Sequence, residues 1–131
     1  MTLGAYLKAA ASRPHVWGIT DCCTFPGDWA MAQGHADPMA DWRGCYGSRE
    51  DAFALMARDG GLLEMFTAGC AAAGIPVAGE AQRGDIGVVL APTDDGSPYV
   101  GGIFDGRRWA LLAAPRGLII ASAMAVRVWR V

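Results

Sequence analysis

The sequence predicts an α+β fold, with helices in the first part of the chain and an antiparallel sheet in the second. Three observations predict it. Alanine-rich amphipathic segments extend to about residue 75, short runs of valine, isoleucine and leucine follow Pro76, and glycines and aspartates separate those runs. Helices that precede a set of neighbouring strands pack on one face of the sheet. We therefore expect N-terminal helices packed on a C-terminal antiparallel sheet of about five strands.

Apolar residues at helical spacing, together with proline, glycine and capping signals, delimit four short amphipathic helices. The predicted ranges are Leu3 to the Arg13-Pro14 stop, Thr24 to Gln33, Ser48 to Arg58 and Leu62 to Ala73. Ser48 and Asp51 are read as a capping box at the start of the third helix.

Short apolar runs bounded by turn residues delimit the strands. The predicted ranges are Ile86–Ala91, Tyr99–Phe104, Arg107–Leu112, Leu118–Ala121 and Val126–Trp129. Asp105-Gly106 lies between two of these runs and favours a type I′ hairpin. The segment from Pro92 to Pro98 is predicted to be a polar loop.

Length and composition predict one well-cored domain over residues 1–131, with a mainly helical part at 1–75 and the sheet at 84–131. The chain has 131 residues, of which 53% are hydrophobic and 18% charged. Its formal net charge of −2 comes without a basic stripe, so nucleic acid is not expected as a partner. No apolar run approaches the roughly 20 residues that span a bilayer.

The first residues show no signal-peptide pattern, so we expect synthesis and folding in a cytoplasm. The four cysteines are then expected to be free thiols. They include no Cys-x-x-Cys pair, and successive side chains such as those of Cys22 and Cys23 usually diverge. Neither a metal site nor a cofactor is therefore expected.

The segment Trp17-Gly18-Ile19-Thr20-Asp21-Cys22-Cys23-Thr24-Phe25 carries the strongest chemical signal, because a turn delivers Cys22 just ahead of a helix. The helix dipole at that end favours thiolate over thiol, and the thiolate is the nucleophile. A backbone N–H at the same place can stabilise an oxyanion. The alternative is a cysteine pair that only packs in the core.

Four motifs occur in an order that resembles a known family. They are Trp17-Gly18 with Asp21-Cys22, then Gly84-Asp85-Ile86, then Val100 to Gly106, and finally Arg116-Gly117-Leu118 with Trp129-Arg130-Val131. With them the chain resembles the NlpC-type papain-like peptidases and amidases of bacterial cell walls, particularly the short relatives encoded by tailed phages and gene transfer agents. The resemblance implies a papain-like (NlpC-type) fold, Cys22 as nucleophile and Asp21 in a supporting position.

The chain departs from that family at its catalytic histidine. The family has histidine at the start of the second core strand, where this chain has Tyr99 or Val100, and no histidine follows His35. A cysteine hydrolase needs a base within hydrogen-bond reach of the thiol. Pro26 is a second departure, since it predicts that the helix begins one or two residues after Cys22.

Two histidines remain as possible bases. His35 follows the helix after Cys22 and would lie on the order of 15 Å from the thiol, which excludes it. His15 could fold back over the Trp17-Gly18 turn and is a weak candidate base, the alternative being an exposed loop histidine.

Four aspartates and two tryptophans are expected to have structural roles in turns and in the core. Asp85, Asp94, Asp95 and Asp105 stand in turns, which aspartate favours for its local hydrogen bonds. Trp42 and Trp129 are expected in the core, with a protein interface as the alternative.

These observations leave three functional hypotheses. The first is a phage or prophage tail-tip component with a degenerate papain-like site, made in the bacterial cytoplasm, resident in the virion tail and in contact with other tail-tip or hub proteins. The second is an active peptidoglycan hydrolase that uses Cys22. The third is a metal-stabilised assembly module.

Overall fold

The computed structural model describes residues 1–91 and 98–131, which contain four helices and six strands. The helices are α1 (Leu3–Ala11), α2 (Thr24–Ala32), α3 (Arg49–Arg58) and α4 (Leu62–Ala72). The strands are β1 (Val77–Ala78), β2 (Ile86–Leu90), β3 (Tyr99–Phe104), β4 (Trp109–Ala113), β5 (Gly117–Ala121) and β6 (Met124–Trp129).

The predicted α+β class is confirmed, as are the four helices and the five predicted strands. The expected strand count is wrong by one, because β1 has two residues and is too short to show a hydrophobic pattern. The predicted loop at 92 to 98 lies, up to residue 97, outside the described residues.

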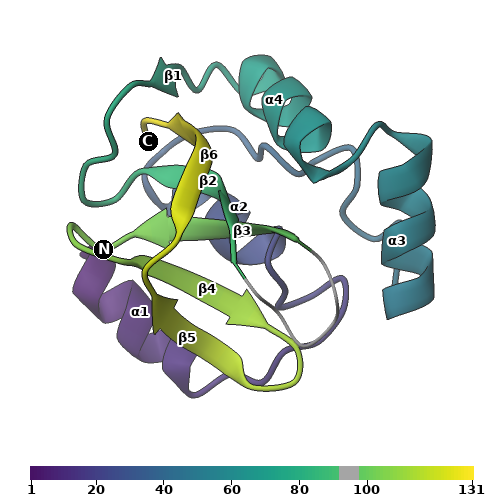
Figure 1. Cartoon of the computed structure of the whole chain (residues 1–131), viewed down its shortest axis with the longest axis horizontal. Helices are drawn as coiled ribbons and strands as arrows, with labels where there is room; N and C mark the ends of the chain where they lie inside the picture. The colour runs from purple at the N-terminus through teal and green to yellow at the C-terminus, as the bar shows by residue number, and fades with distance from the viewer. Residues whose placement is uncertain (92–97) are drawn as a thin grey trace.

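The sheet is antiparallel throughout, with strand order β1-β6-β2-β3-β4-β5. Three strands separate β5 from β6 in that order, yet β5 ends at Ala121 and β6 begins at Met124. So short a connection requires the sheet to curl until β5 approaches the start of β6, and Figure 1 shows the two strands meeting there.

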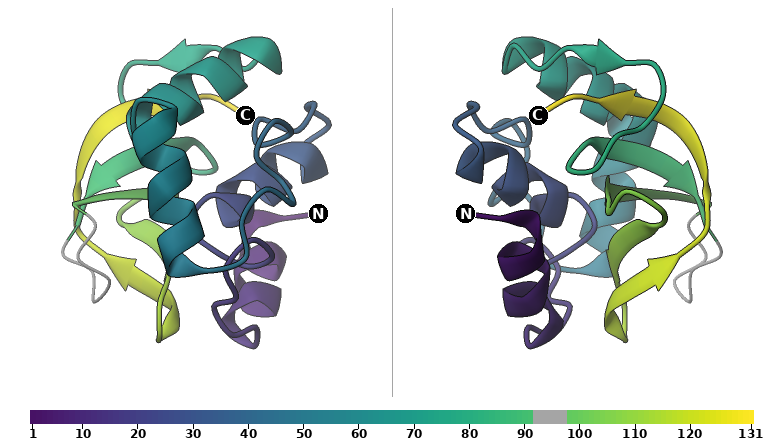
Figure 2. Two further views of the ribbon diagram at one scale, coloured as in Figure 1. Left: turned by 90° about the vertical axis from the view of Figure 1, so that its right-hand side faces the viewer. Right: turned by 90° about the vertical axis from the view of Figure 1, so that its left-hand side faces the viewer.

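The curled sheet buries both of its faces, because successive side chains of a strand point to opposite sides. Helices α1 and α2 lie on one side of it (Figure 2). The core on the helical side includes Phe66, Ile103 and Trp129, and the core inside the curl includes Val100 and Trp109. Trp42 and Trp129 are buried, which confirms their predicted core positions.

The β3–β4 hairpin differs from the predicted type I′ turn. Phe104 pairs with Trp109, and the Asp105 N–H donates to the Arg108 carbonyl at 2.8 Å. The central residues are therefore Gly106 and Arg107, and only Gly106, with φ of 104°, has a positive φ, as in a type II′ turn. The carboxylate of Asp105 instead accepts the backbone N–H groups of Arg107 and Arg108, at 2.8 and 2.6 Å.

Asp85 joins the start of β2 to the end of the chain. Its carboxylate is 2% exposed, accepts the Gln82 N–H at 2.9 Å, and pairs with the Arg130 guanidinium at 3.0 Å. Next to it, the indole N–H of Trp29 donates to the Gly84 carbonyl at 2.8 Å. The Trp29 bond attaches α2 to the segment that leads into β2. The predicted turn positions are confirmed for Asp85 and Asp105, whereas Asp94 and Asp95 lie outside the described residues.

Candidate functional site

Asp21 organises the first turn of α2. Its Oδ1 accepts the N–H groups of Cys23 and Thr24, both at 2.9 Å, and the Thr24 hydroxyl accepts the Asp21 N–H at 2.9 Å. This is a reciprocal capping arrangement, which orients the chain as it enters the helix. It places Cys22 directly after the capping residue, at the N-terminal end of α2.

The second carboxylate oxygen of Asp21, Oδ2, hydrogen bonds to the Gly18 turn and to the loop that carries Tyr46. It accepts the Gly18 N–H at 2.8 Å and the Tyr46 hydroxyl at 2.6 Å. Burial raises the pKa of Tyr46, and the nearby Cys23 and Asp21 raise it further, so the phenol stays protonated and donates. Sequence reasoning missed Tyr46, because it lies in the α2–α3 connection and belongs to no motif.

The carbonyl of Cys22 faces strand β3. Pro26, four residues after Cys22, has no N–H, so the Cys22 carbonyl receives no helical hydrogen bond from it. The regular helix starts at Thr24. The prediction that the helix begins after Cys22 is thus confirmed. Gly101 of β3 lies against the same carbonyl, and a Cβ there would overlap its oxygen. A glycine is therefore required for α2 to approach the sheet.

Cys22 is half-buried and lines a cavity of about 20 Å³ together with His15 and Trp17. Other lining residues include Phe53, Met56, Leu62, Tyr99, Val100 and Leu112. Within residues 1–91 and 98–131, no acceptor receives the Cys22 N–H. The cavity therefore brings Cys22 and His15 to one mainly apolar wall.

His15 is the histidine that the fold brings to this cavity. It is half-buried and packs edge-on against Trp17, with ring centroids 4.6 Å apart, so the expected exposed loop histidine is wrong. His35 follows the end of α2 and is not among the lining residues. Of the two histidines, His15 is therefore the one that shares a cavity with Cys22, and its role as a base stays a prediction.

The start of β3 supplies Tyr99 and Val100 to the same cavity. Strand alternation puts Tyr99 on the same face as Gly101, which meets α2, and puts Val100 in the core inside the curl. Of the two positions that the resemblance implies for the family histidine, Tyr99 is therefore the one on the helical side.

The four thiols are free and stand in different surroundings. Cys23 packs against the core on the helical side and Cys22 against the core inside the curl, as expected for successive side chains that diverge. The neighbouring Cys22 thiol, followed by burial, raises the pKa of Cys23 and keeps that thiol protonated. Cys45 is exposed, and Cys70 is buried. No group of three or more metal-ligating side chains gathers in the described part of the chain.

Burial raises the pKa of Cys70 from its ordinary value of 9.0 to about 12, and this predicts alkaline sensitivity. Below pH 9 the thiol is protonated in both states and contributes no pH dependence. Between pH 9 and 12 only the unfolded thiol ionises, so the free energy of unfolding should fall by about 1 kcal/mol per pH unit. Urea unfolding from pH 8 to 10.5 measures it. Cys70→Ala is the control, and an equal slope in that variant would contradict the assignment.

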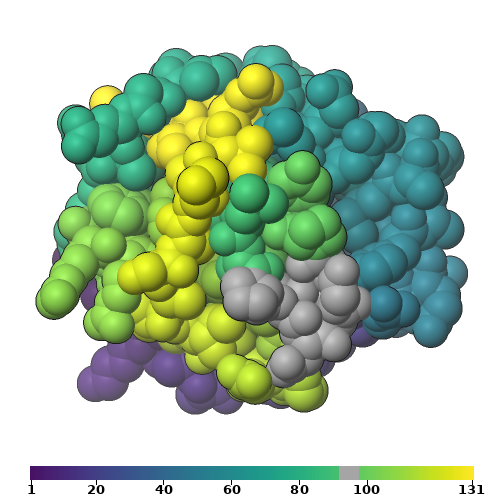
Figure 3. Space-filling view, in the orientation of Figure 1, coloured from purple at the N-terminus to yellow at the C-terminus, as the bar shows by residue number. Residues whose placement is uncertain are grey.

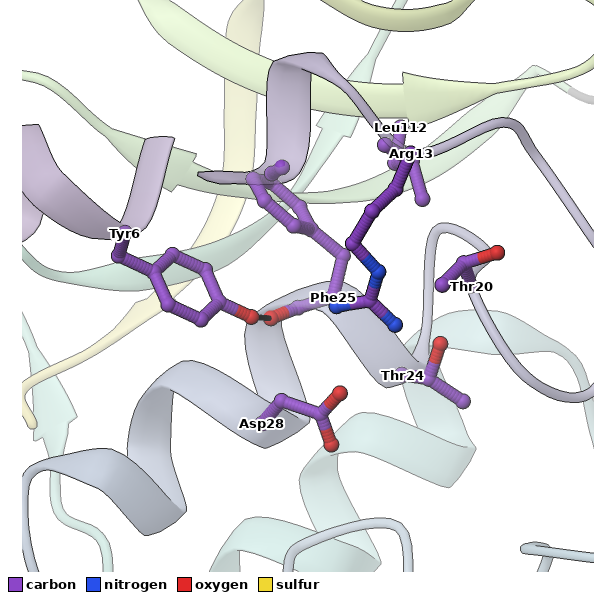
Figure 4. A pocket seen from close by; sticks show the side chains of 8 residues that line it. Tyr6, Arg13, Thr20, Thr24, Phe25, Asp28 and Leu112 are labelled. Atoms are coloured by element: carbon purple, nitrogen blue, oxygen red, sulfur yellow. Dashed lines mark hydrogen bonds between the residues drawn. The ribbon is translucent and has the colours of Figure 1, made fainter. Parts of the chain in front are cut away.

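A second, smaller cavity lies between α1 and α2. Its volume is about 10 Å³, which is room for one water molecule. Tyr6, Arg13 and Asp28 line it, and the Tyr6 hydroxyl donates to the Phe25 carbonyl at 2.6 Å (Figure 4). We assign it to helix packing.

Fold and site together define an α+β protein that presents a thiol at a capped helix start beneath an apolar cavity. Over residues 1–131 the chain matches the family described as Domain of unknown function (DUF6950), and it belongs to that family. No curated protein and no solved structure gives a significant match. None of the helices in the described ranges has the length and apolarity to cross a membrane.

Proposed function

We propose that this chain is a tail-tip component of a phage or prophage, with a papain-like framework around Cys22 that has lost the chemistry of the active relatives. The phage context comes from the resemblance of its motifs to the short tailed-phage proteins. The proposed role is structural, through contacts with other tail-tip or hub proteins.

The observation that supports the loss of catalytic activity is the position of Tyr99. It lies on the helical face of β3 and lines the Cys22 cavity, where the resemblance implies a histidine. A phenol is a poor proton acceptor at neutral pH compared with an imidazole. The remaining described wall from the sheet is apolar and accepts no proton; it consists of Val100, Leu112 and Ala113.

A peptidoglycan hydrolase is the second candidate, and two specific observations favour it. His15 lines the same cavity as Cys22, and the Cys22 N–H has no acceptor among residues 1–91 and 98–131, so it could donate to an oxyanion. An imidazole could take the thiol proton as the sulfur attacks an amide carbon. In this hypothesis His15 replaces the histidine of the strand.

Purified particles test the proposed role. We expect mass spectrometry to find the chain in particles from the encoding phage or prophage, and its deletion to stop tail completion. Cys22→Ala should restore tails and infection in full, because the role needs no nucleophile. Absence of the chain from particles would contradict the tail-tip proposal.

Turbidity loss of purified peptidoglycan separates the two candidates. The wild type should clear peptidoglycan no faster than Cys22→Ala does. Tyr99→His places an imidazole on the helical face of β3 and should clear peptidoglycan faster. Adding Cys22→Ala to that variant should abolish the gain in clearing. Hydrolysis by the wild type that is lost in both Cys22→Ala and His15→Gln would favour the hydrolase instead.

A further inference from the structure

We propose that three arginines at the turn between β3 and β4 form a docking site for a short acidic segment of a partner protein. They are Arg83, Arg107 and Arg108, and we call them the arginine tip. The inference rests on the proposed function in one respect, since the tail-tip role makes the partner a tail-tip or hub protein.

The arginine tip joins two segments that are distant in the sequence. Arg107 and Arg108 belong to the β3–β4 turn, whereas Arg83 precedes β2. The guanidinium of Arg83 donates to the Asp105 carbonyl, and a Cβ at Gly106 would lie 3.4 Å from Cβ of Arg83. Figure 1 shows the loop before β2 beside this turn, at one end of the sheet, and in Figure 3 the light-green turn lies at the left margin of the surface.

The guanidiniums of the arginine tip are available to a ligand. All three residues are exposed, and within the described residues none of the three forms an ion pair with a carboxylate. Asp105 brings a carboxylate to the turn, but its Oδ1 already accepts two backbone N–H groups. Positive charge is therefore in excess at this turn.

The backbone of the turn is fixed before a partner binds. The Gly84 N–H donates to the Phe104 carbonyl and the Phe104 N–H to the Asp85 carbonyl, both at 2.8 Å. A preformed turn loses little backbone entropy on binding. Each guanidinium presents a planar fork of N–H donors that matches the two oxygens of a carboxylate. The arginine tip therefore suits the side chains of Asp and Glu.

The surroundings of the arginine tip favour a short acidic peptide over nucleic acid. Of the eleven basic residues of the chain, three are in the tip, and the other eight are outnumbered by thirteen acidic residues. A long polyanion that extends beyond the tip would therefore meet net negative charge. Single-stranded nucleic acid also needs exposed aromatic faces for stacking. At this turn Trp109 is 3% exposed and packs against Phe104, with ring centroids 5.2 Å apart.

Fluorescence anisotropy with a fluorescein-labelled hexaglutamate peptide tests the site on the purified chain in 0.1 M salt. We expect saturable binding that Arg107→Glu weakens about tenfold, because an attractive contact becomes a repulsive one. Arg107→Gln should have an intermediate affinity. Both variants should unfold in urea at the wild-type midpoint, since the Arg107 side chain is exposed and forms no ion pair among the described residues.

Arg116→Glu is the matched control, because it makes the same charge change at an exposed arginine in the β4–β5 turn. The five residues of β4 separate the two turns by more than the screening length of about 10 Å in 0.1 M salt. We expect less than a threefold loss of affinity there. Equal affinities of the wild type and Arg107→Glu would overturn the inference, as would an equal loss in Arg116→Glu. Tighter binding of a thymidine hexanucleotide than of the peptide would also overturn it.

Cross-linking in particles tests the partner. Arg107→Lys keeps the positive charge and supplies an amine that a carbodiimide joins to carboxylates. We expect mass spectrometry to locate a cross-link from position 107 to an Asp or Glu of a neighbouring tail protein, and none from position 116 in Arg116→Lys. A chain that is present in particles without the cross-link at position 107 would overturn the docking site. Absence of the chain from particles contradicts the tail-tip role alone, because the peptide affinities are measured on the purified chain.

Discussion

Replacing Gly101 by alanine is expected to lower the free energy of unfolding by about 3 kcal/mol, because β3 and α2 leave no room for a methyl group. A Cβ at this position overlaps the carbonyl oxygen of Cys22 and lies 2.7 Å from Cζ of Phe66. The carbonyl belongs to the turn held by Asp21, and Phe66 is fully buried, so neither can yield without loss of packing. Urea unfolding measures the change.

Gly47→Ala is the matched control for that variant. A Cβ at Gly47 would meet no atom within 4 Å, and its φ is not positive. We expect a change of less than about 1 kcal/mol there, since only backbone entropy is affected. If Gly101→Ala were as stable as Gly47→Ala, the close contact between β3 and the start of α2 would be wrong.

Asp21→Ala is expected to cost about 4 kcal/mol, because a carboxylate that is 1% exposed has four hydrogen-bond donors directed at it. The donors are the N–H groups of Gly18, Cys23 and Thr24 and the hydroxyl of Tyr46. Removal of the side chain leaves these donors without their acceptor, and α2 loses its cap. Thermal and urea unfolding at neutral pH measure the loss.

Graded variants show whether the loss has this origin. Asp21→Asn keeps the shape but replaces one acceptor by a donor, so about 2 kcal/mol is expected. Tyr46→Phe removes a single bond and should cost about 1 kcal/mol. Asp41→Ala, at an exposed aspartate in the same part of the chain, should change stability little. A Tyr46→Phe variant as unstable as Asp21→Ala would contradict the capping role of the carboxylate.

Secondary structure was predictable here because its signals are local. Helical spacing lies within the helices, and Ser48 and Gly74 lie within two residues of the helices they delimit. The Ser48 hydroxyl accepts the Asp51 N–H at 3.1 Å as expected. The two-residue β1 could not be predicted, since its pairing with β6 depends on residues about fifty positions away. The β3–β4 turn was displaced by one residue, because the Asp105 side chain takes the N–H groups that follow Gly106.

The candidate site also has one part that local sequence predicts and another that depends on contacts between distant residues. Asp21 and Thr24, three residues apart, hydrogen bond to each other on either side of Cys22, and the position of the thiol at a helix start could therefore be predicted from their order. Tyr46 and Gly101 could not, because each reaches the turn from a distant part of the chain. Their contacts depend on how the elements pack.

Local sequence alone established the helices, five of the strands and a thiol at the open end of α2, since capping and periodicity operate within a few residues. The tertiary structure decided which side chains surround that thiol. Strand register put Tyr99 on the helical face, and the curl of the sheet put Val100 in the second core. Packing also brought His15 to the cavity. Such contacts join residues far apart in the chain, so no local pattern encodes them.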